Sequence, residues 1–318
     1  MSVAMNCPTC NGKTKKAGKH RNGLQRYRCL SCQKRFTEEH ERDFRVEDYL
    51  KTALGIMAIR MLVEGCSIRT VERITGIRPA SVCQLLVIAG QRCEALMNRL
   101  IVNVKVSDVQ ADEIWGFVGK KESHKGPEEA HENSIGDCYT WVALEARTKL
   151  ALAFVVGRRT AANALELMRK LRRATSGDRF QLTTDGLNSY LPAVDEMLSD
   201  RVDFAQLIKV YMAPREGEHR YSPAEIAEAV PVVISGNPNK YRICTSHVER
   251  QNLTMRMQIR RLTRLTNAFS KKLENHKAAV ALHFAHYNFC RIHGTLRVTP
   301  AMEAKITDRV WTIEELLA

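Results

Sequence analysis

Three acidic residues occur where carboxylates could bind a divalent cation. Asp112 ends a predicted strand within QADEIWGFVGKK, and Asp185 comes just after another predicted strand, in QLTTDGLNSY. In open α/β sheets, functional groups gather at the carboxyl ends of the strands. Carboxylate oxygens at that edge can converge on hard cations. The two aspartates are therefore predicted to share a metal site.

A third carboxylate is expected from a helix, and Glu249 in TSHVERQNLTMRMQIRRL is the best candidate. Glu249, Arg256 and Arg260 would fall together on one face of that helix. Another face would be apolar and would pack on the core, and it comprises Val248, Met255, Ile259 and Leu262. Between residues 240 and 272, Glu249 is the only acid among nine Lys and Arg residues. This pattern favours a metal ligand beside contacts to a polyanion.

Each acid also has a simpler interpretation. Asp185 precedes Gly186 and could serve only to form a turn, and Glu249 could serve only as an ion-pair partner. Glu113 could take the place of Asp112, although strand alternation would point its side chain to the opposite face. The hypothesis of an Asp112, Asp185 and Glu249 triad stands against these alternatives.

The cysteines near the N-terminus have the spacing of a zinc site. Two C-x2-C pairs, Cys7/Cys10 and Cys29/Cys32, are separated by eighteen residues. A basic segment this short cannot fold on its own apolar area, so we expect a structural Zn²⁺ bound by the four thiolates. The alternative is four unliganded cysteines. The segment GKHRNGLQRYR between the pairs, with Arg26 and Arg28, favours contact with DNA, and contact with protein is the other interpretation.

Residues 67–90, SIRTVERITGIRPASVCQLLVIAG, have the pattern of two helices joined by a tight turn. Gly76 can supply the left-handed residue of the turn, and Pro79 suits the first turn of the second helix. The residues expected to face inward are Val71, Ile74, Ile77, Val82 and Leu85.

This pattern resembles a helix-turn-helix, except at Glu72, where a small residue is usual. In a helix-turn-helix, Arg78, Ser81 and Gln84 would meet the major groove of DNA. The alternative is an ordinary αα-hairpin without a DNA-binding role.

The chain between and after these motifs predicts an α/β core. Short β-rich segments that read as strands are 104–112, 138–145, 150–156, 179–184 and 202–210, with a helix over 161–174. Strands with interspersed helices indicate an α/β fold. We expect a zinc ribbon at 1–36, a helix-turn-helix domain at 46–100, a catalytic domain at 104–300 with an insertion at about 211–241, and a C-terminal tail at 301–318.

The overall charge of the chain points to the kind of partner. The 318 residues include 49 Lys and Arg against 35 Asp and Glu, which gives a net charge of +14. Such a balance favours nucleic acid or an anionic membrane surface. No apolar run approaches the length of a membrane span, and the first residues show no apolar signal region. We therefore expect a cytoplasmic nucleic-acid-binding protein with no membrane partner.

Together these residues resemble the transposases of the insertion-sequence-one family, in the form that joins zinc, helix-turn-helix and catalytic parts in one chain. The resemblance is carried by the cysteine pairs, ADEIWGFVGKK, TTDG, HVERQNLTMRMQIRRLTRLTNAFSKK and the closing segment HYNFCRIHGTLRVTPAMEA. It covers nearly the whole chain. The stretch between Asp185 and Glu249 is longer than in compact relatives because of the insertion.

The resemblance implies a ribonuclease H-like catalytic domain, with a mixed sheet and flanking helices, and an Asp-Asp-Glu triad formed by Asp112, Asp185 and Glu249. Arg256 matches the basic residue seven positions after the family's glutamate. Two Mg²⁺ ions per active site, for which Mn²⁺ could substitute, would activate water and then a terminal 3′-hydroxyl for attack on phosphodiesters. The implied partners are double-stranded DNA, at element ends and at the target, and further copies of the chain in a homodimer or higher oligomer.

Two other functions compete with this expectation. A DNA-binding regulator without catalysis would explain the charge, the cysteines and the paired helices, but it would leave the acids of the α/β core without a role. A nuclease of the same fold would cut DNA without joining it.

Overall fold

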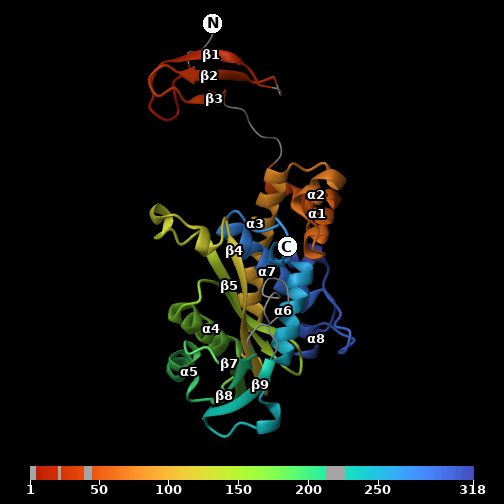
Figure 1. Cartoon of the computed structure of the whole chain (residues 1–318). Coiled ribbons are helices and arrows are strands. Elements are labelled where there is room, and N and C mark those ends of the chain that lie inside the picture. Colours follow the sequence, from red (N-terminus) through yellow and green to blue (C-terminus); the bar gives the residue numbers. More distant parts are fainter. Residues whose placement is uncertain (1–4, 21–22, 39–44, 213–225) are drawn as a thin grey trace. The chain divides into compact units, whose positions relative to one another are not determined.

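The computed structural model describes residues 5–20, 23–38, 45–212 and 226–318 of the chain. The contacts within it define two compact units, residues 1–45 and residues 46–318. Both are drawn in Figure 1. None of the helices in the described residues is long and apolar enough to cross a bilayer.

The first unit is a three-stranded antiparallel sheet with the order β1-β2-β3. Its strands are β1 (Thr14–Lys19), β2 (Gln25–Cys29) and β3 (Arg35–Thr37). A left-handed residue follows each cysteine pair, Asn11 with φ 55° and Gln33 with φ 61°. These turns reverse the chain tightly enough for the two pairs to face each other. Residues 21 and 22 of the basic segment lie outside the described residues.

The second unit begins with four helical segments: η1 (Val46–Lys51), α1 (Ala53–Val63), α2 (Ile68–Thr75) and α3 (Pro79–Leu100). The Ser67 side chain accepts a hydrogen bond from the Thr70 amide and so caps α2. Gly76 ends α2 in the left-handed conformation, with φ 73°. Pro79 is the first residue of α3, as its missing amide proton favours.

The interior of these helices differs from the expectation at one residue. Val71, Ile77, Val82 and Leu85 are buried, but Ile74 is 61% exposed. The physical reason is that α2 ends only one residue after Ile74. Ile77, on the far side of the left-handed turn, fills the interior instead.

The core of the second unit is a six-stranded mixed sheet with the order β6-β5-β4-β7-β8-β9. Its strands are β4 (Asp108–Val118), β5 (Gly136–Glu145), β6 (Ala151–Gly157), β7 (Phe180–Asp185), β8 (Val202–Tyr211) and β9 (Ile226–Ser235). β4, β7 and β8 are parallel, whereas β5, β6 and β9 run antiparallel to their neighbours. This is the mixed sheet that the family resemblance implied.

Helices cover both faces of this sheet. Figure 1 shows α4 (Ala161–Ala174) and α5 (Tyr190–Leu198) on one side, and α6 (Ser246–Gln258) and α7 (Leu273–Phe289) on the other. The long α3 packs along α7. The close approach of these two helices requires Gly90, because a Cβ atom there would lie 2.5 Å from the Cα of Ala278. The remaining short helices are η2 (Glu122–His124), η3 (Pro127–Glu129), η4 (Lys240–Arg242), η5 (Arg260–Leu262), α8 (Pro300–Glu303) and α9 (Ile313–Leu317).

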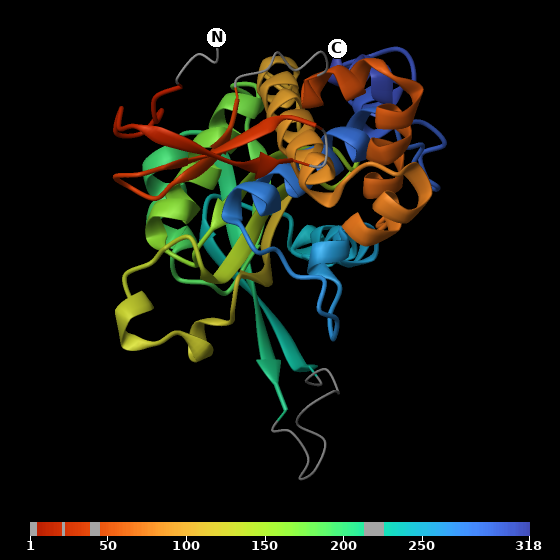
Figure 2. The same ribbon diagram turned by 90° about the horizontal axis from the view of Figure 1, so that it is seen from above.

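Two parts of the sheet differ most from the expectation. The strand expected at 104–112 begins at Asp108 and continues to Val118, so Asp112 lies in mid-strand rather than at its end. Antiparallel pairing with β5, which places Trp115 opposite Tyr139, extends β4 beyond the acids. The expected insertion contains β9, which pairs with β8. Figure 2 shows these two strands extending from the sheet as a ribbon. Residues 213–225 lie outside the described residues.

Candidate active site

Asp112 and Asp185 lie side by side at one level of the sheet. The last pair between β4 and β7 joins Ala111 to Thr184, and each aspartate is the next residue in its strand. The Asp112 carboxylate accepts hydrogen bonds from the Glu113 amide at 2.8 Å and from the Asn252 side chain on α6 at 2.9 Å. The Asp185 carboxylate accepts one from the Leu187 amide at 3.2 Å. Both aspartates therefore lie next to each other, at the point where the parallel pairing of β4 with β7 ends.

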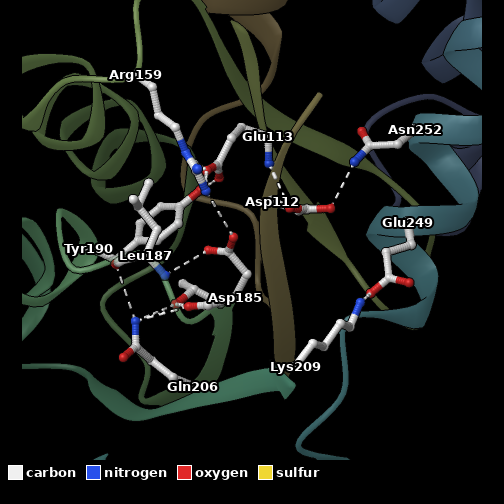
Figure 3. Close-up of polar contacts among 11 residues, drawn as sticks. Asp112, Glu113, Arg159, Asp185, Leu187, Tyr190, Gln206, Lys209, Glu249 and Asn252 are labelled. Carbon is white, nitrogen blue, oxygen red and sulfur yellow. Dashed lines mark hydrogen bonds and ion pairs between the residues drawn. The ribbon is translucent and has the colours of Figure 1, made fainter. Parts of the chain in front are cut away.

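Glu113 is a third acid in this cluster. Its carboxylate accepts hydrogen bonds from Arg159 Nε at 2.6 Å and from Tyr190 Oη at 3.1 Å, both on the α4/α5 side of the sheet (Figure 3). Strand alternation therefore separates its contacts from those of Asp112, which face α6. Even so, one oxygen each of Asp112, Glu113 and Asp185 lies within 4.8 Å of the others. Arg159 also reaches Asp185, with 3.5 Å between Nη2 and Oδ2.

Glu249 lies in the first turn of α6, on the Asp112 side of the sheet. Its Oε1 atom accepts hydrogen bonds from the Thr245 hydroxyl and from the Lys209 ammonium on β8. It is not one of the acids grouped within 4.8 Å. Its charge nevertheless contributes to the raised pKa of both Asp112 and Asp185. The structure thus brings the two aspartates together and places Glu249 near them, bound to Lys209.

Two amide side chains dock α6 onto the strand that bears Asp112. Gln110 of β4 is fully buried, and its Oε1 accepts hydrogen bonds from the His247 and Val248 amides at 2.9 and 3.2 Å. It thereby caps α6, whose N-cap residue Thr245 makes no capping bond with its own side chain. Asn252 makes the second contact, directly to Asp112. Sequence reasoning missed both residues. The one available signal was an amide, Gln110, two residues before Asp112 and between the apolar residues Val109 and Ala111.

The electrostatics of the cluster favour binding of a cation. Burial, together with the charges of Asp185 and Glu113, raises the pKa of Asp112 to about 7. Burial is also the main cause of the raised pKa values of Glu113 and Asp185, which Arg159 partly opposes. Several carboxylates in a partly buried site repel one another, and a divalent cation would relieve that repulsion. The oxygen donors are those that a hard cation such as Mg²⁺ prefers.

This electrostatic arrangement predicts how stability depends on pH. The folded-state pKa of Asp112 lies above its ordinary value of 3.8, so the folded chain holds a proton that the unfolded chain releases. The stability that this bound proton contributes is fully present below about pH 4. It is lost as the pH rises through about 7, the folded-state pKa of Asp112. In EDTA, Asp112→Asn should therefore be more stable than the unaltered chain at pH 8 and similar at pH 4. Urea unfolding at the two pH values tests this, and an equal difference at both would contradict it.

The basic residues expected beside Glu249 do not all lie on α6. The helix ends at Gln258, because Ile259 adopts an extended conformation. Arg256 lies in the last turn and is half-buried, which lowers the pKa of its guanidinium to about 10. Arg260 lies beyond the helix, exposed in η5. The expectation that Glu249, Arg256 and Arg260 share one helical face is thus wrong for Arg260.

The four cysteines of the first unit form a compact cluster. The Sγ atoms of Cys7 and Cys32 are 3.6 Å apart, and those of Cys10 and Cys29 are 3.5 Å apart. One sulfur from each cysteine lies within 4.8 Å of the others. Hydrogen bonds from backbone amides, chiefly that of Thr9, lower the pKa of Cys7 to about 6. Four converging sulfurs with amide donors fit a tetrahedral metal ion.

The DNA-contact candidates outside the acid cluster differ in exposure. Arg78 and Gln84 are exposed at the start of α3, and Ser81 is partly buried between them. Arg26 and Arg28 both lie in β2 and are partly buried.

The chain matches two transposase families over separate segments. The family described as a DDE domain matches residues 135–216, and the IS1 transposase family matches residues 237–290. The first segment contains Asp185 and the second contains Glu249, while Asp112 lies outside both. Both matched segments thus resemble transposases, the first a DDE domain and the second an IS1 transposase.

Solved transposase structures show only distant similarity to the chain. The Mos1 strand transfer complex gives a TM-score of 0.21 at 16% identity, covering 52% of this chain and 60% of that one. The piggyBac transposase synaptic complex with hairpin DNA gives 0.37 at 12% identity, covering 88% and 72%. The chain thus spans about 60% of the length of the Mos1 chain. No curated protein matches it.

Proposed function

We propose that the chain is a transposase of the insertion-sequence-one family, which cleaves DNA at the ends of a bacterial insertion sequence and joins those ends to target DNA. The observation that carries the proposal is the pair Asp112 and Asp185, side by side on β4 and β7 and facing the α6 helix that bears Glu249. Two of these three acids lie in the segments that match transposase families. The proposed reaction is phosphodiester hydrolysis followed by attack of the freed 3′-hydroxyl on the target strand.

In this proposal Asp112, Asp185 and Glu249 hold two Mg²⁺ ions, with Mn²⁺ as a substitute. Metal ions held by these carboxylates would supply Lewis-acid activation of the attacking oxygen and stabilisation of the leaving oxygen. Asn252 orients the Asp112 carboxylate, and Gln110 fixes the start of α6 and with it the position of Glu249. Arg256 and Arg260 are proposed to contact DNA phosphates beside the site.

Glu113 has two possible roles in such a site. As a metal ligand it would join Asp112 and Asp185, to which its carboxylate is close. As a positioning residue it would hold Arg159, which in turn contacts Asp185. We favour the positioning role because both Glu113 oxygens already accept hydrogen bonds, from Arg159 and Tyr190.

The first unit is proposed to be a zinc ribbon that binds DNA. Lys15 of β1, Arg28 of β2 and Arg35 of β3 lie directly opposite one another across the three strands. Like charges in such a row destabilise a sheet, and a polyanion on that face would compensate them. Arg26 lies two residues from Arg28 and so projects from the same face. This row favours DNA over protein as the partner of the ribbon.

The segment from Val46 to Leu100 is proposed to form a DNA-binding helix-turn-helix domain, followed by a ribonuclease H-like catalytic domain over 104–300 and a tail over 301–318. The left-handed Gly76 and the exposure of Arg78 and Gln84 at the start of α3 support this role. Because two element ends must be cut and joined in concert, we propose that a homodimer or higher oligomer acts on double-stranded DNA. The proposed location is the bacterial cytoplasm, on nucleoid DNA.

A cleavage assay separates the proposal from a DNA-binding regulator. The full chain is incubated with labelled duplexes that carry the element end, in Mg²⁺, in Ca²⁺ or in EDTA. A transposase should nick the duplex at the end in Mg²⁺ only, whereas binding should occur in all three conditions. Binding without cleavage in Mg²⁺ and in Mn²⁺ would favour the regulator.

A further inference from the structure

Lys209 joins the β8–β9 ribbon to the candidate active site. Its ammonium donates a hydrogen bond to Glu249 Oε1, the same oxygen that the Thr245 hydroxyl reaches (Figure 3). The Lys209 side chain is 18% exposed, compared with 40% for that of Glu249. It therefore holds a largely buried positive charge against one of the acids proposed to bind metal.

This ion pair is poorly explained as a stabilising contact. Lys209 lies in the outer half of β8, where its neighbours Ile208 and Val210 are 40% and 47% exposed. The Glu249 carboxylate is 40% exposed, so solvent weakens its attraction for Lys209, while burial of the ammonium is unfavourable. Arg159 offers a contrast, because it contacts two acids, Glu113 and Asp185, and also lies over the Tyr139 ring. Arg159 is thus fixed by several partners, whereas Lys209 makes its one side-chain hydrogen bond in the described residues with Glu249 and also acts on Asp185 through its charge.

We propose that Lys209 is a counter-ion that a divalent cation displaces from Glu249, and that the freed ammonium then binds a phosphate of the DNA in the active site. The inference rests on the proposed function, in which Glu249 is a metal ligand. A lysine ammonium and a divalent cation compete for the same carboxylate oxygen. The released ammonium stays tethered to β8 beside the acids, where a DNA phosphate is its natural anionic partner. Metal binding and DNA binding are thereby coupled through one side chain.

The direct test is the affinity of the full chain for Mn²⁺, measured by isothermal titration calorimetry without DNA. Lys209→Met removes the competing charge and should tighten Mn²⁺ binding on the order of tenfold. Lys209→Arg keeps the charge and should stay within about twofold of the unaltered chain. The matched control is Lys170→Met, which breaks a similar half-exposed pair with Glu94 elsewhere in the unit and should leave the affinity unchanged. Tighter binding cannot result from misfolding.

A second measurement tests the phosphate contact. DNA affinity is measured by fluorescence anisotropy in Ca²⁺ and in EDTA. Lys209→Met should weaken DNA binding in Ca²⁺. It should also reduce the slope of the logarithm of the binding constant against the logarithm of the salt concentration by about 0.9 in magnitude, the value for one lost phosphate contact. In EDTA, where Lys209 remains on Glu249, the variant should bind DNA as tightly as the unaltered chain.

The outcomes distinguish this inference from the proposed function. If Lys209→Met binds Mn²⁺ as the unaltered chain does, or more weakly, the ammonium is no competitor and the inference is overturned. Loss of DNA affinity in EDTA as well would show a metal-independent contact and would also overturn it. If the unaltered chain binds no Mn²⁺, or if Asp112→Asn leaves Mn²⁺ binding unchanged, the proposed metal site itself fails and the inference fails with it.

Discussion

Asp112→Asn, Asp185→Asn and Glu249→Gln should each lower Mg²⁺-dependent cleavage and joining by at least about 10³-fold. Each change keeps nearly the same side-chain volume but removes the negative charge that a divalent cation requires. Binding of end DNA should remain, and it should tighten slightly because a negative charge near phosphate is gone. Gel analysis of labelled end duplexes measures cleavage and joining, and fluorescence anisotropy measures binding.

Two further acids of β4 serve as comparisons. Asp108→Asn is the matched control, because Asp108 is buried on the same strand four residues before Asp112, and it should retain activity. Glu113→Gln should lose activity only in part, about tenfold, because its proposed task is to hold Arg159. If Glu113→Gln were as inactive as Asp112→Asn while Glu249→Gln cleaved normally, the metal ligands would be Asp112, Glu113 and Asp185 instead.

Cys29→Ser should release the proposed zinc ion and unfold the ribbon expected at residues 1–36. The three-stranded sheet of the first unit is too small to bury a sizeable apolar core, so we propose that its stability depends on the metal. Structural zinc sites contribute about 10–16 kcal/mol at pH 7 in comparable small modules. Elemental analysis should find one zinc per unaltered chain and almost none in the variant. The affinity for end DNA should fall with the ribbon, as the cation row of Lys15, Arg28 and Arg35 is lost.

The second unit should be unaffected by this substitution. It has its own apolar core over residues 46–318, so its thermal unfolding transition should keep the same midpoint. Cys66→Ser, which changes a single cysteine of the second unit, should retain the zinc. An unaltered chain that contains no zinc, or a Cys29→Ser variant that retains it, would refute the zinc ribbon.

Some parts of the fold follow from local sequence. Thr183, Thr184 and Asp185 end a strand before Gly186, and the structure ends β7 at Asp185, one residue beyond the expected boundary. The helix expected at 161–174 has the same bounds in the structure. In both cases the spacing of the apolar residues and the residues that end the element lie within or next to the segment itself. Such signals do not depend on distant parts of the chain.

Other parts depend on pairing between distant segments. β4 continues past Asp112 only because β5 pairs with it, and an acidic Asp-Glu step gives no local sign of continuation. β9 contains Pro231, and proline lacks the amide proton that a strand interior uses for pairing. The sheet tolerates this proline because β9 is an edge strand. Only one of its sides pairs with another strand, so a missing amide proton costs little there. The end of α6 at Gln258 was likewise hidden, because the apolar spacing continues to Leu262 through η5.

The polar contacts of the candidate site were the least accessible to sequence reasoning. Gln110 meets α6 across 137 residues of chain, and Lys209 meets Glu249 across 40. No local pattern pairs such residues. The acids could be proposed from their types and surroundings, but their counter-ions and the side chains that orient them required the arrangement of strands and helices.

The joining of a pre-cut element end to target DNA tests the central claim most directly. The full chain is incubated in Mg²⁺ with a duplex whose transferred strand ends in a 3′-hydroxyl or in a 3′-deoxy terminus, together with supercoiled target plasmid. The account predicts covalent joining of the 3′-hydroxyl end only, and none with Asp185→Asn. A chain that binds this end and cleaves uncut duplex but never joins it would be a nuclease, and that result would contradict the account.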